Sequence, residues 1–150
     1  EPLPDAIETM RALHQAMRAG LVRACHDCSE GGLAVAAAEM AFAGRLGLDL
    51  YLAHLPRSPG VDRDDVALFA ESSGRFLVEV RPEDVPAFEA ALAGRPLACL
   101  GSIPGPRPSS QQEGELDRPH RFRVYGLGGE LAIDCALDDL LRAWQSPEVA

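Results

Sequence analysis

CHDCSEGGLAVAAAEMAFA, residues 25–43, is the stretch of this sequence that decides the fold. Residues 22–25 read as the end of a short buried strand, and an alanine-rich run with helical character begins at Leu33. The helix would open on Gly31 and Gly32, although a glycine in a helical turn costs about 1 kcal/mol relative to alanine. Because a helix start presents unpaired N–H groups, such a bare turn favours the close approach of an anion or of a neighbouring chain.

Helices and strands alternate along the rest of the chain. Helical periodicity, turn residues and strand patterns predict helices over 5–19, 31–43, 62–70, 82–93 and 136–144, and strands over 21–25, 46–52, 76–80, 97–103, 122–125 and 131–135. The order lacks strict strand–helix–strand regularity, so it predicts an α+β fold in which one mixed β-sheet is layered with helices. Residues 105–119 are rich in Pro, Ser, Gln and Gly, which predicts a flexible loop.

Size and composition are those of one globular domain. The 150 residues are 47% hydrophobic and 25% charged, which suffices for a core, and the net charge of −9 argues against nucleic acid and anionic membranes as partners. No apolar run reaches the roughly 20 residues of a membrane span and no signal sequence is apparent, so we expect a cytoplasmic protein with reduced cysteines. Residues 1–4 read as a linker, and we expect a single C-terminal domain over 1–150, cut from a longer multidomain enzyme.

The turn after the first strand carries two chemical patterns. Cys25 and Cys28 have the spacing of a redox dithiol, and with His26 they could form half of a zinc site, although structural zinc needs four ligands. His26 and Asp27 could form an acid–base pair, whereas Asp27 or Ser29 could instead cap the following helix. A free-standing dithiol or metal-binding module is therefore one alternative function.

A second polar turn precedes the strand at 76–80. It reads ESSGR, residues 71–75, and joins two hydroxyls and a guanidinium on a flexible loop, a combination that can hold a phosphate or a carboxylate. Glu71 could also bind a metal or a ligand amine. The alternative is a solvated turn with a surface Glu–Arg pair, which contributes little to stability.

The sequence in and around these two turns resembles the second half of the proteins of the phosphoribosylformylglycinamidine synthase family, the large-subunit type called PurL. The stretches that carry the resemblance are AGLVRA (19–24), HDCSEGGLAVA (26–36), AEM (38–40), LFAESSGRFLVEV (68–80) and LAID (131–134), with Leu137, Leu140, Leu141 and Trp144 at the end. The similarity covers nearly the whole chain, and a motif of this length is specific.

The resemblance implies a fold similar to that of the C-terminal domain of aminoimidazole ribonucleotide synthetase. The superfamily of this synthetase also includes selenophosphate synthetase and a hydrogenase maturation protein. It implies the last of four domains in an ATP-dependent ligase that converts formylglycinamide ribonucleotide and glutamine to the amidine in purine biosynthesis. ATP and magnesium would be bound mainly by N-terminal domains outside this chain. The resemblance therefore assigns no catalytic residue and no metal ligand here, and we expect the isolated chain to be inactive.

The partners implied are the N-terminal ATP-binding domains of the same polypeptide, a glutaminase subunit and a small accessory subunit. Eight residues are candidates for contact with a phosphate, a substrate or the interdomain cleft: His26, Asp27, Ser29, Gly31, Gly32, Glu71, Ser72 and Arg75. In the family, the turn matching 71–75 faces a second, largely structural nucleotide site. Two further alternatives are a paralogue of the aminoimidazole ribonucleotide synthetase or selenophosphate synthetase type, and an interaction domain without a ligand.

Overall fold

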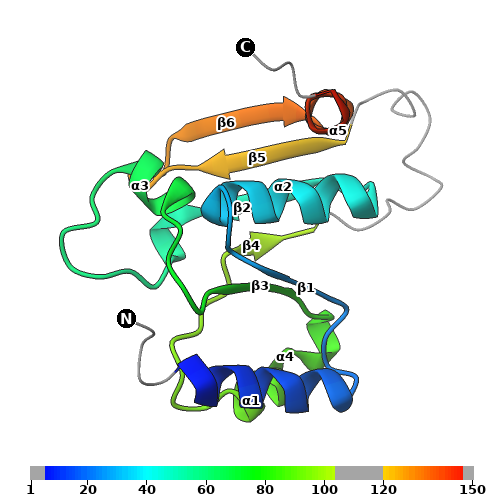
Figure 1. Cartoon of the computed structure of the whole chain (residues 1–150), viewed down its shortest axis with the longest axis vertical. Helices are drawn as coiled ribbons and strands as arrows, with labels where there is room; N and C mark the ends of the chain where they lie inside the picture. The colour runs from blue at the N-terminus through cyan, green and yellow to red at the C-terminus, as the bar shows by residue number, and fades with distance from the viewer. Residues whose placement is uncertain (1–5, 104–119, 147–150) are drawn as a thin grey trace. The chain divides into compact units, whose positions relative to one another are not determined.

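The computed structural model describes residues 6–103 and 120–146 (Figure 1). The chain forms two compact units, and within the described residues the first comprises 6–37 and 56–99. The second comprises 38–55 together with the described residues from 100 onward. The expected linker over 1–4 and the expected loop over 105–119 lie outside the described residues. No helix of the described part has the length and apolar character needed to cross a bilayer.

In the first unit, two helices cover one face of a two-stranded ribbon (Figure 1). Its elements are α1 (Ala6–Arg18), β1 (Ala24–Asp27), α3 (Asp64–Phe69), β3 (Phe76–Glu79), the 3-10 turn η2 (Pro82–Asp84) and α4 (Val85–Ala91). β1 and β3 are antiparallel, with Cys25 opposite Val78. Leu13 and Ala16 of α1 pack with Phe88 of α4 in a buried cluster against the ribbon. Burial of these apolar side chains fixes α1 beside the strands.

The second unit is built on a four-stranded sheet. Its elements are β2 (Leu48–Tyr51), the 3-10 turn η1 (Leu52–His54), β4 (Gly101–Ser102), β5 (Arg121–Tyr125), β6 (Leu131–Ala136) and α5 (Leu137–Gln145). The strand order is β4-β2-β5-β6, with β2 parallel to β5 and the other pairs antiparallel. Leu50, Phe122 and Val124 point to the buried face. The sheet is therefore mixed, as the sequence predicts.

Helix α2 (Gly32–Gly44) runs from the first unit into the second. Ala34, Ala36 and Ala37 are buried, which fits an alanine-rich helix made for close packing. Near its end, Phe42 contacts Trp144 of α5, with ring centroids 5.7 Å apart.

The structure departs from the sequence prediction in its strands. The described strands form two sheets rather than one. β1 covers 24–27 instead of 21–25, so that His26 and Asp27 belong to the strand. The predicted strand over 97–103 shrinks to β4, because pairing with β2 begins only where Tyr51 N–H donates to the Leu100 carbonyl, at 2.7 Å.

The helix predicted over 82–93 is also divided. Its first turn is the 3-10 turn η2, and α4 follows from Val85. Pro86 lacks an N–H and cannot make the α-helical bond to the residue four positions earlier, which explains why the first turn is not α-helical.

Candidate functional site

The turn from β1 into α2 depends on two glycines in a left-handed conformation. Gly31 has a φ of +71° and Gly32 a φ of +61°. A residue with a side chain would pay a steric cost of about 1–2 kcal/mol at each position. The N–H of Gly32 donates to the Ser29 carbonyl at 3.1 Å and closes the turn. Glycine is therefore required here by backbone conformation.

Gly32 also lies directly against the chain at the end of α3. A Cβ on Gly32 would lie 2.7 Å from the carbonyl oxygen of Leu68 and 2.9 Å from that of Ala70. Both distances are shorter than ordinary van der Waals contact, and both partners are backbone atoms. The sequence predicted that something approaches this turn closely. The structure shows that the backbone of residues 68–70 does so.

The N–H of Gly31 is bound by a carboxylate of the same chain. It donates to Oε1 of Glu71 at 3.0 Å. A negative charge at a helix start is favoured by the helix dipole. Both glycine N–H groups thus bond within the chain, which differs from the expectation of amides open to an outside anion. The reason is that the turn at 71–75 folds back onto the start of α2.

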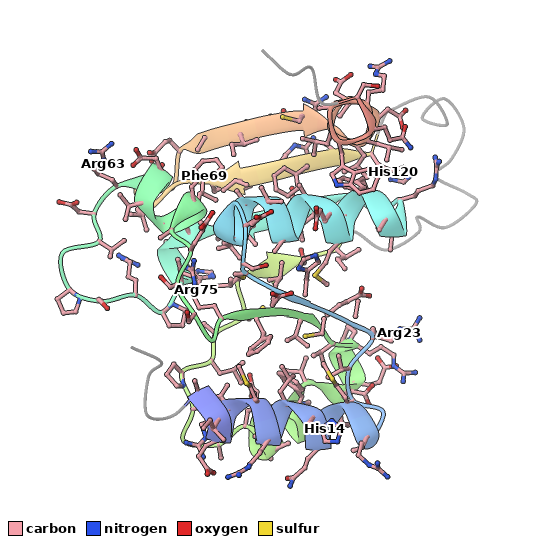
Figure 2. The ribbon with its side chains drawn as sticks, viewed as in Figure 1. His14, Arg23, Arg63, Phe69, Arg75 and His120 are labelled. Carbon is pink, nitrogen blue, oxygen red and sulfur yellow. The ribbon has the colours of Figure 1, made fainter. Side chains whose placement is uncertain are left out.

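The turn at 71–75 is held to the turn after β1 by a backbone hydrogen bond, and a side chain of its own fixes its shape. The N–H of Cys28 donates to the Arg75 carbonyl at 3.0 Å. Figure 2 shows Arg75 at the start of β3, and its Nη2 donates to the carbonyl oxygen of Ala70. The guanidinium is partly buried and is used to fix its own turn. Gly74, with a φ of +80°, lets the chain reverse just before Arg75.

An open hollow with a volume of about 810 Å³ lies beside these turns, entirely within the first unit. Its lining comes from α1 (Met10, Leu13, His14, Met17), from β1 and the turn after it (Cys25, Asp27, Cys28, Ser29, Glu30), and from the second turn with the start of β3 (Glu71, Ser72, Ser73, Gly74, Arg75, Phe76). Five of the candidate residues are therefore brought together: Asp27, Ser29, Glu71, Ser72 and Arg75. His26, Gly31 and Gly32 do not belong to the lining.

His26 and Asp27 are neighbours in β1, and their side chains lie within ion-pair distance but beyond hydrogen-bond distance. Nδ1 of His26 lies 2.7 Å from the backbone oxygen of Asp27 and 3.7 Å from its carboxylate. The second distance exceeds that of a hydrogen bond, about 2.6–3.2 Å, which an acid–base pair needs. The imidazole is instead held against the backbone.

Helix α1 supplies a wall of the hollow that the sequence analysis did not predict. The helical period of Ile7, Met10, Leu13, Ala16 and Met17 predicts a core-facing stripe, but only Leu13 and Ala16 are buried. The exposed fractions are 61% for Ile7, 47% for Met10 and 40% for Met17. These five positions span about half the helix circumference at 3.6 residues per turn, a width that could have indicated a second apolar surface.

The environment of the two neighbouring thiols opposes the dithiol alternative. Burial raises the pKa of Cys25, and the nearby Asp27 raises it further. Burial also raises the pKa of Cys28, an effect that the charge of Arg75 partly offsets. Redox dithiols rely on a lowered thiol pKa. Within 6–103 and 120–146, no group of three or more His, Cys, Asp or Glu side chains is placed to hold a metal ion.

The raised pKa predicts slow alkylation of Cys28. At about pH 8, iodoacetamide should modify the exposed Cys99 faster than the buried Cys28, because a raised pKa leaves less thiolate at that pH. The rate at Cys28 should rise as the pH increases toward its pKa. Mass spectrometry of peptides sampled over time measures both rates. Faster modification of Cys28 than of Cys99 would show a lowered pKa and support the dithiol function.

Comparison with known proteins identifies the family. The model for "AIR synthase related protein, C-terminal domain" matches residues 1–103. Phosphoribosylformylglycinamidine synthase subunit PurL of Deinococcus radiodurans is 49% identical over 133 residues, which are 87% of this chain and 15% of the relative. The PurL subunit of Anaeromyxobacter dehalogenans is 35% identical over 144 residues, 92% of this chain and 16% of the relative. The chain thus spans about one sixth of the length of these two relatives.

Solved structures show the same fold. Thermotoga maritima PurL complexed with ATP superposes with a TM-score of 0.69 at 20% identity, covering 88% of this chain and 21% of that one. T. maritima PurL complexed with FGAR superposes with a TM-score of 0.70 at 20% identity, covering 90% of this chain and 20% of that one. HypE of Escherichia coli, a hydrogenase maturation protein, superposes with a TM-score of 0.58 at 22% identity. The superposition covers 84% of this chain and 38% of HypE. These likenesses confirm the predicted α+β fold.

Since the family model matches more than half of the sequence, the chain belongs to the AIR synthase related proteins as their C-terminal domain, and its resemblance to PurL is confirmed.

Proposed function

We propose that this chain serves as the C-terminal domain of a phosphoribosylformylglycinamidine synthase. The whole enzyme would convert formylglycinamide ribonucleotide and glutamine to the amidine in an ATP-dependent reaction. The observation that carries this proposal is the 49% identity to the D. radiodurans PurL subunit over 87% of the chain. A paralogue function is less well supported, because the HypE likeness rests on fold at 22% identity.

The described residues do not fit a nucleoside triphosphate or its magnesium. The hollow carries three carboxylates, and its one arginine, Arg75, is bonded to a backbone carbonyl. Like charges repel, so this lining disfavours a phosphate chain. In the described part of the chain, no three His, Cys, Asp or Glu side chains converge to hold Mg²⁺. We therefore assign ATP and magnesium to other domains of the synthase and give this domain a positioning role, which matters in phosphoryl transfer.

In this proposal the hollow faces a neighbouring domain of the same polypeptide. Asp27, Ser29, Glu71, Ser72 and Arg75 would make the contact. The three other candidates would shape the turn beneath it, through the backbone bonds of the glycines and of the imidazole. A neighbouring domain can cover the apolar side chains of this lining and also form hydrogen bonds with its polar side chains, because interdomain surfaces combine both kinds of group.

The wider setting of the proposal includes a multisubunit, cytoplasmic enzyme. A solved structure described as PurLQS from T. maritima superposes on this chain with a TM-score of 0.70 at 19% identity. We propose that the synthase containing this domain assembles with a glutaminase subunit and a small accessory subunit. The four cysteines are all thiols, which suits a reducing compartment.

A domain graft tests the proposed function. The C-terminal domain of D. radiodurans PurL is replaced by this chain, and the chimera is expressed in bacteria that lack their own synthase. Growth without added purines and amidine formation by the purified chimera are the expected results. The isolated chain, assayed in parallel, should form no amidine. A soluble, folded chimera without activity would contradict the proposal, and so would amidine formation by the isolated chain.

A further inference from the structure

The sequence contains two tyrosines, Tyr51 and Tyr125, and the second unit brings them side by side. Tyr51 ends β2 and Tyr125 ends β5, and the two residues are direct partners in the parallel pairing of these strands. Their rings are stacked, with centroids 4.7 Å apart and planes 8° from parallel. Aromatic pairs in proteins generally have centroids about 4.5–7 Å apart, so this pair lies at the close end of that range.

The stacked pair lies on the outer face of the sheet. Side chains alternate between the two faces along a strand, and the preceding residues, Leu50 and Val124, are buried on the opposite face. Tyr51 is 37% exposed, and Tyr125 is half-buried. A small oxidant in solution can therefore reach the pair, and neither ring belongs to the buried core.

Hydrogen bonds of the backbone hold both tyrosines in register. The N–H of Tyr51 donates to the Leu100 carbonyl at 2.7 Å, and the N–H of Gly126, next to Tyr125, donates to the Glu130 carbonyl at 2.7 Å. Among the described strands, β2 and β5 are the central pair of their sheet. A radical formed on one ring therefore has a coupling partner already beside it, which replaces a bimolecular encounter by an intramolecular step.

We propose that Tyr51 and Tyr125 form an oxidative cross-linking site. A one-electron oxidant, such as a haem peroxidase working with hydrogen peroxide, removes one electron from each phenol, and each O–H proton passes to water. The two phenoxyl radicals couple through ring carbons ortho to the oxygens, and the hydrogens on these carbons move to the oxygens to restore two phenols. The pair loses two electrons and two protons in all, which reduce one peroxide to two waters. The product is a dityrosine bond between β2 and β5.

The new bond would fix the centre of the sheet covalently. A cross-link between residues far apart in sequence restricts the unfolded chain more than the folded one. The cross-linked chain should therefore unfold at a higher urea concentration than the untreated chain. This inference concerns the second unit alone and does not depend on the proposed function.

Photo-oxidation of the 150-residue chain tests the cross-link. The oxidant is a tris(bipyridyl)ruthenium complex with persulfate under brief illumination, and the monomer is then treated with dithiothreitol and digested with trypsin. Cleavage after arginine places Tyr51 in the peptide 46–57 and Tyr125 in the peptide 124–142. Mass spectrometry should find these two peptides joined with the loss of two hydrogen atoms, in a yield that does not change on dilution of the protein. In concentrated urea the yield should fall at least about tenfold, because the stack is lost.

Matched variants locate the bond. Tyr51→Phe and Tyr125→Phe each keep an aromatic ring in the stack but lack the phenol, and each should abolish the joined peptides. His54→Gln is the control, because the His54 ring is also near Tyr51, with centroids 5.9 Å apart. It should leave the yield unchanged. A bond between Tyr51 and His54 would stay within the peptide 46–57 and would join no second peptide.

Four results would overturn the inference. These are cross-links found only between molecules, with a yield that falls on dilution; a bond confined to the peptide 46–57; joined peptides that persist in either phenylalanine variant; and equal yields with and without urea. None of these results depends on ligase activity, so a failed cross-link would leave the proposed function in place.

Discussion

Replacing Gly32 with alanine is expected to lower the free energy of unfolding by about 2–5 kcal/mol. A φ of +61° costs a residue with a side chain about 1–2 kcal/mol. The new Cβ would also meet the carbonyl oxygens of Leu68 and Ala70 at 2.7 and 2.9 Å, and shifting backbone out of such a contact costs about 1–3 kcal/mol more. Urea unfolding followed by circular dichroism measures the change.

Gly20→Ala is the matched control for this prediction. Gly20 also has a positive φ, of +75°, but nothing lies within 4 Å of its Cβ position. Only the conformational cost of about 1–2 kcal/mol should appear. If the two variants lost the same stability, the close approach of residues 68–70 to the start of α2 would not contribute to it.

Replacing Leu13 with alanine is expected to have the second large effect. Leu13 is 4% exposed and packs with Phe88 and Leu92 under the ribbon. Truncating a buried leucine to alanine costs about 2–5 kcal/mol, from lost burial and the cavity left behind. The same urea unfolding experiment applies. Because Leu13 also lines the hollow, its truncation would change the α1 wall of the hollow as well.

Met10→Ala separates the two faces of α1. Met10 is 47% exposed although it follows the same helical period as Leu13. Its truncation should cost less than about 1 kcal/mol, as for most surface substitutions. A loss as large as that of Leu13→Ala would mean that Met10 is buried in solution, and the exposed apolar stripe would not exist.

Local patterns predicted most of the helices and the closing hairpin. The apolar period after Asp5 predicts a helix over 5–19, and α1 covers Ala6–Arg18. The turn at 126–129 between two apolar runs predicts a hairpin, and β5 and β6 form it. These elements were predictable because their signals lie within a few neighbouring residues.

Long-range pairing could not be predicted in the same way. Whether β1 joins the larger sheet or pairs only with β3 depends on contacts between residues far apart in sequence. The same holds for position 32, where glycine is required partly because the backbone of residues 68–70 leaves no room for a Cβ. The sequence showed that the turn needed space but could not show whether a ligand or the chain itself would occupy it.

The candidate site was predicted in part. The two polar turns were identified from their residue types, and the structure brings five of their side chains to one hollow. The wall from α1 was missed, because an apolar stripe at helical spacing is normally assigned to the core. The width of that stripe, which includes both Leu13 and Ile7, was the available signal.

The turn at 29–32 is closed by the chain's own groups, and one measurement tests this directly. In ¹H–¹⁵N spectra of the 150-residue chain, the amide signals of Gly31 and Gly32 are followed while inorganic phosphate replaces chloride at constant ionic strength. Both signals should move no more than that of Gly60, and Glu71→Gln should shift Gly31 because its hydrogen-bond partner changes. Saturable shifts of Gly31 and Gly32 with phosphate in the unmodified chain would contradict the closed turn and restore an anion site there.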